Sequence, residues 1–232
     1  MAKMQKTGQS APRPVENARK DASGKKEKPS IAERDRAVAL LRAGKIVAFP
    51  TDTVFGLGVR ADRDAAAKAL FALKSRPPHM PLSVLCADMN MVRALVRINE
   101  TARRLASLWP GALTLVLPLR TGASVSAVAN AGLSSLGVRI PAHDAVRELI
   151  VRTGVPLATS SANRSGQPTV MDAETLVRTF GNDLFFLEGG RAPGGTASTI
   201  LDVTGPQAHL LRAGGLSVAD ITARTGVPVV TA

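Results

Sequence analysis

Five short clusters of polar residues combine side chains that can bind a small anionic molecule. PTDT places two threonines and a carboxylate at the end of an apolar run, where such side chains are poor core material. The other clusters supply cations, hydroxyls and Gly/Pro-rich backbone, which are groups that hold carboxylates and phosphates. In chain order they are PTDT (50–53), KSRPPHMP (74–81), VRIP (138–141), TSSANRSGQPT (159–169), and GGTASTI (194–200) together with LLRAG (210–214).

Each cluster also has a purely structural interpretation. PTDT can form a turn through local hydrogen bonds, and Lys74 with Arg76 can be a solvated helix end that complements the helix dipole. Arg139 is harder to explain in this way, because both of its sequence neighbours are apolar and an unpaired buried charge is expensive. It must reach solvent or meet an anion. The segment 159–169 can be a linker, although its place after a strand favours a phosphate-binding nest.

Considered together, the clusters predict a basic, hydroxyl-rich pocket for a small substrate and a polyphosphate. The sequence has no GxxxxGK[ST] motif and no GxGxxG motif after a strand, and no Ser-His-Asp arrangement stands out. The single cysteine, Cys86, excludes an internal disulfide and a cysteine-based zinc site. Three scattered histidines argue against a histidine-based metal site. We therefore predict no dedicated metal site.

The apolar periodicity predicts alternating helices and strands, which is typical of an α/β fold with a largely buried, mixed sheet. Capping-box spacing precedes the first helix and the last one. Predicted helices span 31–43, 64–73, a short stretch after Asp88, 99–108 and 144–152, and two more begin at Asp172 and Ser217. Predicted strands span 45–49, 54–59, 82–87, 112–118, 136–140, 156–159, 184–187, 198–203 and 209–212. Every polar cluster then lies at a strand end or on a loop, where α/β proteins build ligand sites.

Composition and charge set the broad class of the protein. The 232 residues suit one domain, and a hydrophobic content of 45% suffices for an aliphatic core. Residues 1–29 contain eight Lys or Arg, three acids and almost no large apolar residue, so we expect a disordered basic tail before a folded domain at 30–232. No apolar run approaches the roughly 18 residues of a membrane span, and no signal peptide is evident. We expect a soluble, cytoplasmic protein.

Six ordered motifs resemble those of the YrdC family, whose members are threonylcarbamoyl-AMP synthases. They extend over about residues 31–216 and read FPTDTVFGLG, LKSRPPHMPLSVL, WPGALTLVLP, GVRIPAHD, ATSSANRSGQPT, and STILDV with LLRAG. The resemblance implies a single domain with a twisted, open, mixed β-sheet, flanked by helices and presenting a basic concave surface. It implies that L-threonine, bicarbonate or CO2, and ATP are joined into threonylcarbamoyl-AMP with release of pyrophosphate. The length resembles the short form of the family, which has no extra C-terminal domain.

The resemblance also implies partners and site residues. The product would serve N6-threonylcarbamoylation of adenosine 37 in ANN-decoding tRNAs by a separate transferase, with tRNA as a further expected partner and Mg²⁺ arriving with ATP. The motifs place threonine against Thr53, Arg139 and Ser198. They place ATP against six residues, of which the first two are also the expected catalytic residues: Lys74, Arg76, Thr114, Ser161, Asn163 and Arg212.

Two departures from the family pattern are visible. The family usually shows TSAN, whereas here three hydroxyl residues precede Ala162, so either Thr159 or Ser160 fills the threonine position. Phe55 stands where tyrosine is common. We expect that change to be harmless unless the missing hydroxyl binds a ligand.

Two other classes of protein compete with this interpretation. A non-catalytic RNA-binding protein acting in tRNA or rRNA maturation would also be basic, since neutralising phosphate needs only Lys and Arg. Against it, the sequence has no tyrosine and one tryptophan, so few aromatic rings are available for base stacking. A hydrogenase-maturation protein with related carbamoyl-adenylate chemistry would have additional zinc and acylphosphatase-like domains, which the sequence does not show.

Overall fold

The computed structural model describes residues 29–167, 169–170, 172–181, 183–187 and 195–231. The predicted basic tail lies outside these residues, residue 29 excepted, so its disorder stays a prediction. Within the described residues helices and strands alternate along the chain. The predicted α/β class is confirmed.

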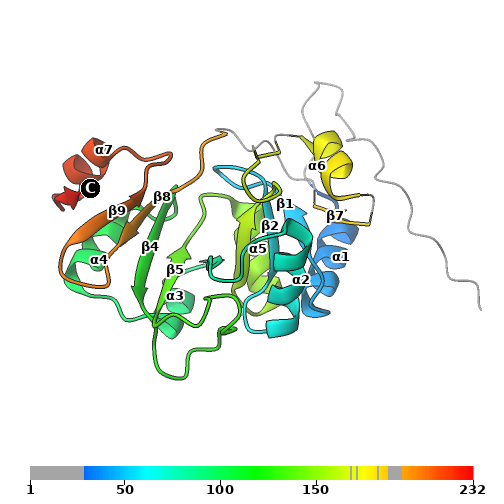
Figure 1. Ribbon diagram of the computed structural model, residues 1–232, viewed down its shortest axis with the longest axis horizontal. Helices are drawn as coiled ribbons and strands as arrows, with labels where there is room; N and C mark the ends of the chain where they lie inside the picture. Colours follow the sequence, from blue (N-terminus) through cyan, green and yellow to red (C-terminus); the bar gives the residue numbers. More distant parts are fainter. Residues whose placement is uncertain (1–28, 168, 171, 182, 188–194, 232) are drawn as a thin grey trace, which may run out of the picture.

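One mixed β-sheet extends along the length of the molecule (Figure 1). The strand order is β10-β9-β8-β4-β5-β3-β6-β2-β1-β7, and the sheet contains both parallel pairs, such as β3 with β5, and antiparallel pairs, such as β4 with β5. Because the two ends of the order are different strands that do not pair with each other, the described sheet is open. The strands are β1 (Val47–Phe49), β2 (Gly56–Arg60), β3 (Ser83–Leu85), β4 (Leu113–Pro118), β5 (Ser135–Arg139), β6 (Leu157–Ser161), β7 (Phe185–Phe186), β8 (Thr199–Asp202), β9 (Ala208–Arg212) and β10 (Val229–Val230).

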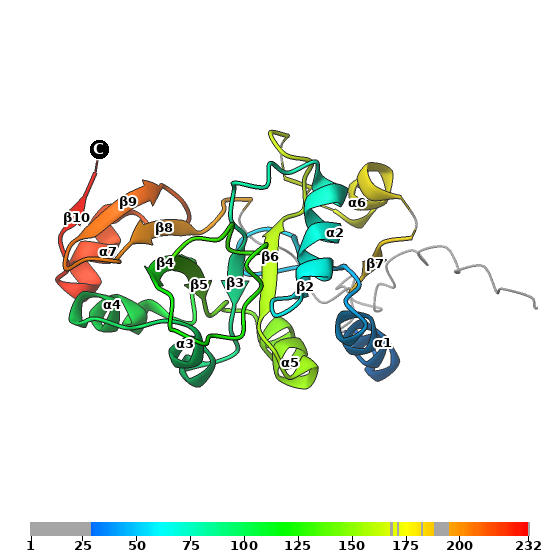
Figure 2. The same cartoon turned by 60° about the horizontal axis from the view of Figure 1, so that its bottom comes forward.

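Helices flank the sheet on both sides. In Figure 2, α1, α5, α3 and α4 follow one another along one side of the molecule, while α2 and α6 lie on the other side. The described helices are α1 (Ile31–Arg42), α2 (Asp64–Lys74), α3 (Met89–Leu95), α4 (Glu100–Leu105), α5 (Asp144–Thr153), α6 (Ala173–Phe180) and α7 (Val218–Thr225), with a 3-10 turn η1 (Ala106–Leu108) after α4.

Side-chain caps fix where several of the helices begin. Ser30 accepts from the backbone N–H of Glu33, and the Glu33 carboxylate accepts from the backbone N–H of Ser30, so the predicted capping box is present. The side chains of Asp88, Asp172 and Ser217 each accept from the backbone N–H three residues later and so cap α3, α6 and α7, without the reciprocal bond seen in α1 among the described residues. These starting points were all predicted from the sequence.

Alternating side chains of the strands pack against helices on opposite faces. Val47 and Phe49 belong to the core under α1 and α5, whereas Ala48 between them belongs to the core under α2. Leu85 and Leu157 continue the first of these faces. The polar side chains of Ser83 and Thr159 lie on the same face by strand alternation. The fold therefore leaves hydroxyls at the border of an apolar core.

Two glycines allow close approaches that shape this border. A Cβ atom at Gly58 would lie 2.6 Å from the ring of Phe49, and one at Gly214 would lie 2.4 Å from the backbone of Ser198. Any larger residue at Gly214 would push β9 and its arginine away from Ser198.

The structure differs from the predicted elements mainly at strand ends. β1 begins at Val47 rather than at residue 45, and β6 continues to Ser161 rather than ending at residue 159. The predicted helix 99–108 divides into α4 and η1, and β10 was not predicted.

Candidate active site

The five polar clusters meet around one cavity of about 190 Å³. Its walls come from strands that are far apart in the chain, including β2, β4, β5, β6 and β8. Seven of the nine candidate site residues line it: Thr53, Arg76, Thr114, Arg139, Ser161, Ser198 and Arg212. Hydroxyl residues that no motif assigned to a ligand line it as well, namely Thr51, Ser83, Thr159 and Ser160. Both candidates for the threonine position of TSAN are therefore at the cavity.

The PTDT segment forms a hydrogen-bonded turn after β1. The Thr51 hydroxyl donates to the carbonyl of Val54 at 2.7 Å and accepts from the backbone N–H groups of Thr53 and Val54. Since the single hydroxyl proton of Thr51 is used in this way, the Thr53 hydroxyl donates to Thr51 across 3.0 Å. Thr51 therefore holds the turn, and Thr53 is the threonine that meets the cavity cation.

Arg139 is the most completely bonded cation of the cavity. Its Nη2 lies 2.6 Å from Oδ1 of Asp52, its Nη1 donates to the Thr53 hydroxyl at 3.0 Å, and its Nε donates to the carbonyl of Gly111 at 2.8 Å. The residue is 5% exposed. Burial lowers the pKa of Arg139, and Asp52 opposes that shift. Asp52 is thus the anion that we expected a buried Arg139 to need.

Arg76 and Arg212 have a different environment from Arg139. Arg76 donates to the carbonyls of Met80 and Pro81 at 2.9 and 2.8 Å, and Arg212 donates to the carbonyl of Ser198 at 2.7 Å. Among the described residues neither arginine has a carboxylate partner within 4.0 Å. Desolvation lowers both pKa values, and so does a neighbouring cation: Arg212 acts on Arg76, and Arg139 acts on Arg212. In the described residues, this part of the cavity therefore carries two arginine charges that no carboxylate balances.

Two buried hydroxyls join the two parts of the cavity. Thr114 on β4 and Ser198 before β8 are 1% and 6% exposed, and their hydroxyl oxygens lie 2.8 Å apart. Ser198 also accepts a long hydrogen bond of 3.3 Å from Nη2 of Arg212. Ser198 therefore lies between an arginine and a second hydroxyl, as a ligand-orienting group would.

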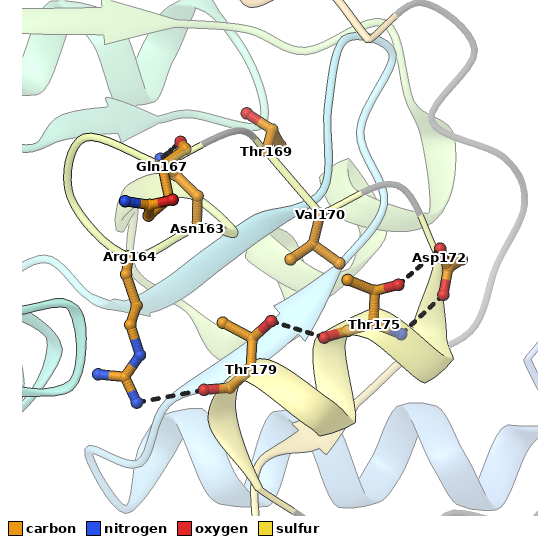
Figure 3. A pocket seen from close by; sticks show the side chains of 8 residues that line it. All are labelled: Asn163, Arg164, Gln167, Thr169, Val170, Asp172, Thr175 and Thr179. Carbon is orange, nitrogen blue, oxygen red and sulfur yellow. Dashed lines mark hydrogen bonds between the residues drawn. The ribbon is translucent and has the colours of Figure 1, made fainter.

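Lys74 and Asn163 do not line this cavity. The ammonium of Lys74, which is 1% exposed, donates to the carbonyls of Ser161 and Asn163 and to Oδ1 of Asn163. Asn163 instead lines a separate polar groove of about 420 Å³ between the 163–170 segment and α6 (Figure 3). Several N–H groups of the predicted phosphate nest, including those of Ala162 and Ser165, donate to backbone carbonyls inside the protein.

Phe55 lies apart from both spaces. It is 3% exposed and packs edge-on against Phe186, with ring centroids 5.4 Å apart. Phe55 is therefore a core residue, and it lines neither the cavity nor the groove.

The described residues contain no group of three or more His, Cys, Asp or Glu side chains that could hold a metal ion. Among the three cavity arginines, Arg139 is the one that pairs with a carboxylate in the described residues, and its partner is Asp52. The part of the chain covered by the structure also contains no helix of sufficient length and apolarity to cross a membrane.

Comparison with known proteins relates this geometry to a family. The model of the Sua5/YciO/YrdC family, described as telomere recombination, matches residues 39–214. Threonylcarbamoyl-AMP synthases of Pyrococcus abyssi and Bacillus subtilis are 40% and 39% identical to the chain over 80% and 85% of its length. The chain spans 55% and 57% of those relatives. The crystal structure of P. abyssi Sua5 complexed with L-threonine matches with a TM-score of 0.77 at 37% identity, covering 85% of this chain and 58% of that one.

Proposed function

The chain belongs to the Sua5/YciO/YrdC family, and from this premise we propose that it is an L-threonylcarbamoyladenylate synthase, a nucleotidyltransferase. It would join L-threonine, bicarbonate or CO2, and ATP into threonylcarbamoyl-AMP and release pyrophosphate. The observation that supports this most directly is the convergence of Arg76, Arg139 and Arg212 on one small cavity. Both substrates that must meet, an amino acid carboxylate and a polyphosphate, are anions.

The two parts of the cavity suit the two anions. Threonine would place its carboxylate near Arg139 and Thr53, with Ser198 close to its polar side chain. ATP would place its phosphates against Arg76 and Arg212, with Thr114 and Ser161 as hydroxyl donors. A cavity of about 190 Å³ is smaller than the roughly 300–1,000 Å³ of typical ligand pockets. The enclosed space therefore suits the amino acid and the reacting phosphate, and the nucleoside would extend outside it.

The reaction itself needs positioning and charge stabilisation from the protein. The neutral threonine amine forms an N–C bond to the carbon of CO2 as one C–O π bond opens and one N–H proton passes to solvent. The resulting carbamate oxygen attacks the α-phosphorus as the bond to pyrophosphate breaks. Negative charge accumulates on the α-phosphate and the departing pyrophosphate. Fixed cations at Arg76 and Arg212 can stabilise that charge, and no nucleophilic side chain is required. ATP would enter as its Mg²⁺ complex, with the metal held by phosphate oxygens and water.

The cellular role follows from the product. Threonylcarbamoyl-AMP is an activated acyl donor that a separate transferase would consume to modify adenosine 37 of ANN-decoding tRNAs. The synthase would act in the cytoplasm, where ATP and tRNA are present. Direct contact with tRNA is part of this proposal, and the strongly basic sequence supports it.

The test is to incubate the purified protein with labelled threonine, bicarbonate and ATP and to search for a new adenylate. Pyrophosphate release should require all three substrates together. Release that is independent of threonine would contradict the proposal. Retention of tRNA on a filter without any ATP-dependent product would instead support a non-catalytic RNA-binding protein.

A further inference from the structure

Of the four candidate cations in the described chain, Lys74 is the one outside the cavity lining. It is the last residue of α2, and its ammonium donates to two carbonyls, of Ser161 and Asn163, and at 3.1 Å to Oδ1 of Asn163. An ammonium has three N–H groups, so these acceptors use all of them. In return, the Lys74 carbonyl accepts from the backbone N–H of Ser165 at 3.1 Å. The end of α2 is thus bonded to the 161–165 turn in both directions.

The side chain of Asn163 extends this network. Its Oδ1 accepts from the Ser161 hydroxyl at 2.5 Å as well as from Lys74, and its Nδ2 donates to the carbonyl of Gln167 at 2.6 Å. Because the oxygen and nitrogen of the carboxamide have opposite partners, the group cannot turn over without losing these bonds. Ser161 lines the cavity and Asn163 lines the groove of Figure 3, so the turn that Lys74 holds forms a wall between them.

The direction of the carbonyls matters for an anion site. A carbonyl oxygen that accepts a hydrogen bond from buried Lys74 is directed away from the cavity, and its partial negative charge is then kept from phosphate oxygens. The partners of Lys74 are neutral, and no carboxylate lies within 4.0 Å of its ammonium in the described residues. Desolvation, followed by the nearby Arg76, lowers the pKa of Lys74 to about 8. A buried, partly compensated charge is costly, which argues for a role beyond filling space.

We propose that Lys74 is a positioning residue that holds the Ser161–Asn163 turn for ATP, and that it acts through Asn163 and Ser161 rather than by touching phosphate. This inference rests on the proposed function and changes the role that the motif resemblance gives to Lys74. Arg76, two residues later, lines the cavity and is the residue that contacts the nucleotide phosphates.

A pair of double-mutant cycles distinguishes the two roles, with kcat/KM for ATP as the readout. If Lys74 acts through Asn163, the effects of Lys74→Met and Asn163→Ala overlap. The double variant is then within about 2-fold of the worse single variant, although each alone lowers kcat/KM by about 10-fold or more. In contrast, the reductions in kcat/KM caused by Lys74→Met and Arg76→Ala should multiply in their double variant. The opposite result, in which Lys74→Met multiplies with Asn163→Ala but overlaps with Arg76→Ala, would show that Lys74 touches phosphate.

Two further variants keep the test decisive. Lys68→Met makes the same chemical change at an exposed position of α2 and should leave kcat/KM unchanged. If Lys74→Met does not fold, as judged by circular dichroism, Lys74→Gln retains two N–H donors without the charge. Deprotonation removes one donor from wild-type Lys74, so the ratio of wild-type to Lys74→Gln turnover should fall between about pH 7 and 9.5. A constant ratio would contradict a positioning role for the charged form.

Failure of the proposed function is separable from failure of this inference. If the wild-type protein forms no threonylcarbamoyl-AMP, the proposed function is wrong. The same cycles can then be measured as dissociation constants for a non-hydrolysable ATP analogue by titration calorimetry. Overlap of Lys74→Met with Asn163→Ala in that measurement supports the positioning role, and multiplication contradicts it.

Discussion

The Arg139 part of the cavity and the Arg76–Arg212 part handle positive charge in different ways. Arg139 is nearly inaccessible to solvent, and its guanidinium is fixed by a carboxylate, a hydroxyl and a carbonyl. Arg76 and Arg212 are fixed mainly by backbone carbonyls. Three of the five N–H groups of Arg139 are therefore used inside the protein, and its charge is balanced, whereas the charges of the other two arginines are not.

This difference indicates how one cavity can distinguish two anions. A balanced, rigid guanidinium with two remaining N–H groups favours a small carboxylate by geometry, because little net charge is left to attract other anions. Two unbalanced guanidiniums favour a polyphosphate by charge, with less demand on geometry. Threonine would then be selected by hydrogen-bond geometry, and ATP by net charge. The variants below test this division, in order of decreasing expected effect.

Arg139→Lys should give the largest effect, and it should act on threonine. Lysine keeps the charge but loses the planar guanidinium group. In Arg139 this group bonds to Asp52 and Thr53 and still has other N–H groups for a ligand. Loss of a charged hydrogen bond of about 2 kcal/mol would raise KM for threonine roughly 30-fold, with KM for ATP changed less than about 3-fold. Steady-state kinetics measures the two KM values, and calorimetric titration measures threonine binding directly. Arg93→Lys, at an exposed position on α3, is the control.

Arg76→Ala should have the next largest effect, and it should act on ATP. Removal of one unbalanced charge from the polyphosphate end should raise KM for ATP roughly 10-fold, or lower kcat if the side chain acts on departing pyrophosphate. The effect should shrink at high ionic strength. Titration with a non-hydrolysable ATP analogue measures binding directly. If Arg139→Lys and Arg76→Ala weakened both ligands equally, the two parts of the cavity would not be distinct.

The sequence could predict the elements whose determinants are local. Ser30, Asp88 and Asp172 cap helices through bonds to residues three positions away, and this spacing is readable in the sequence. Strand ends depend on partners that are distant in the chain, and the two-residue β10 exists through its pairing with Ala208 and His209. Two valines favour a strand, but a run this short does not predict one without its partner. The bounds of β1 and β6 differ from the prediction for the same reason.

The same distinction applies to the candidate site. The motifs identified which residues gather, because composition at strand ends limits where a ligand can bind in an α/β fold. They did not identify what Asp52 and Lys74 do. The Asp52–Arg139 and Lys74–Ser161 bonds each join residues 87 positions apart, so neither can be inferred from spacing. The one available signal for Asp52 was a carboxylate between two threonines, one of which had been assigned to a ligand.

Asp52→Asn should make the Arg139 part of the cavity more like the Arg76–Arg212 part, because it removes the carboxylate that balances the charge of Arg139. Asparagine retains an acceptor for Arg139 but leaves its charge unbalanced, as at Arg76. We expect a loss of about 2 kcal/mol in the free energy of unfolding, or roughly 6 °C in Tm, because a hydrogen bond between two charged groups becomes a bond to a neutral acceptor. Inorganic phosphate should raise the Tm of this variant more than that of wild type, because the anion replaces the lost carboxylate.

Asp62→Asn provides the matched control for that experiment. Asp62 pairs with Arg60 through two bonds of 2.6 Å outside the cavity, so its loss should also lower Tm. Phosphate should not restore the stability of this variant selectively. Equal protection of both variants by phosphate would mean that the Arg139 end has no special capacity for anions.

Deletion of residues 1–28 should give the smallest catalytic effect, because it removes cations that no motif places at the cavity. The segment contains eight Lys or Arg and three acids. Threonine-dependent turnover should stay within about 2-fold of wild type, since Arg76, Arg139 and Arg212 are untouched. Affinity for tRNA should fall, and the loss should shrink as salt rises, because counter-ion release drives such binding. A full-length variant in which glutamine replaces Lys25, Lys26 and Lys28 should reproduce part of the loss of tRNA affinity. If the truncated protein lost most of its turnover, cations outside the cavity would take part in catalysis, and the contrast between its two parts would not suffice to explain substrate binding.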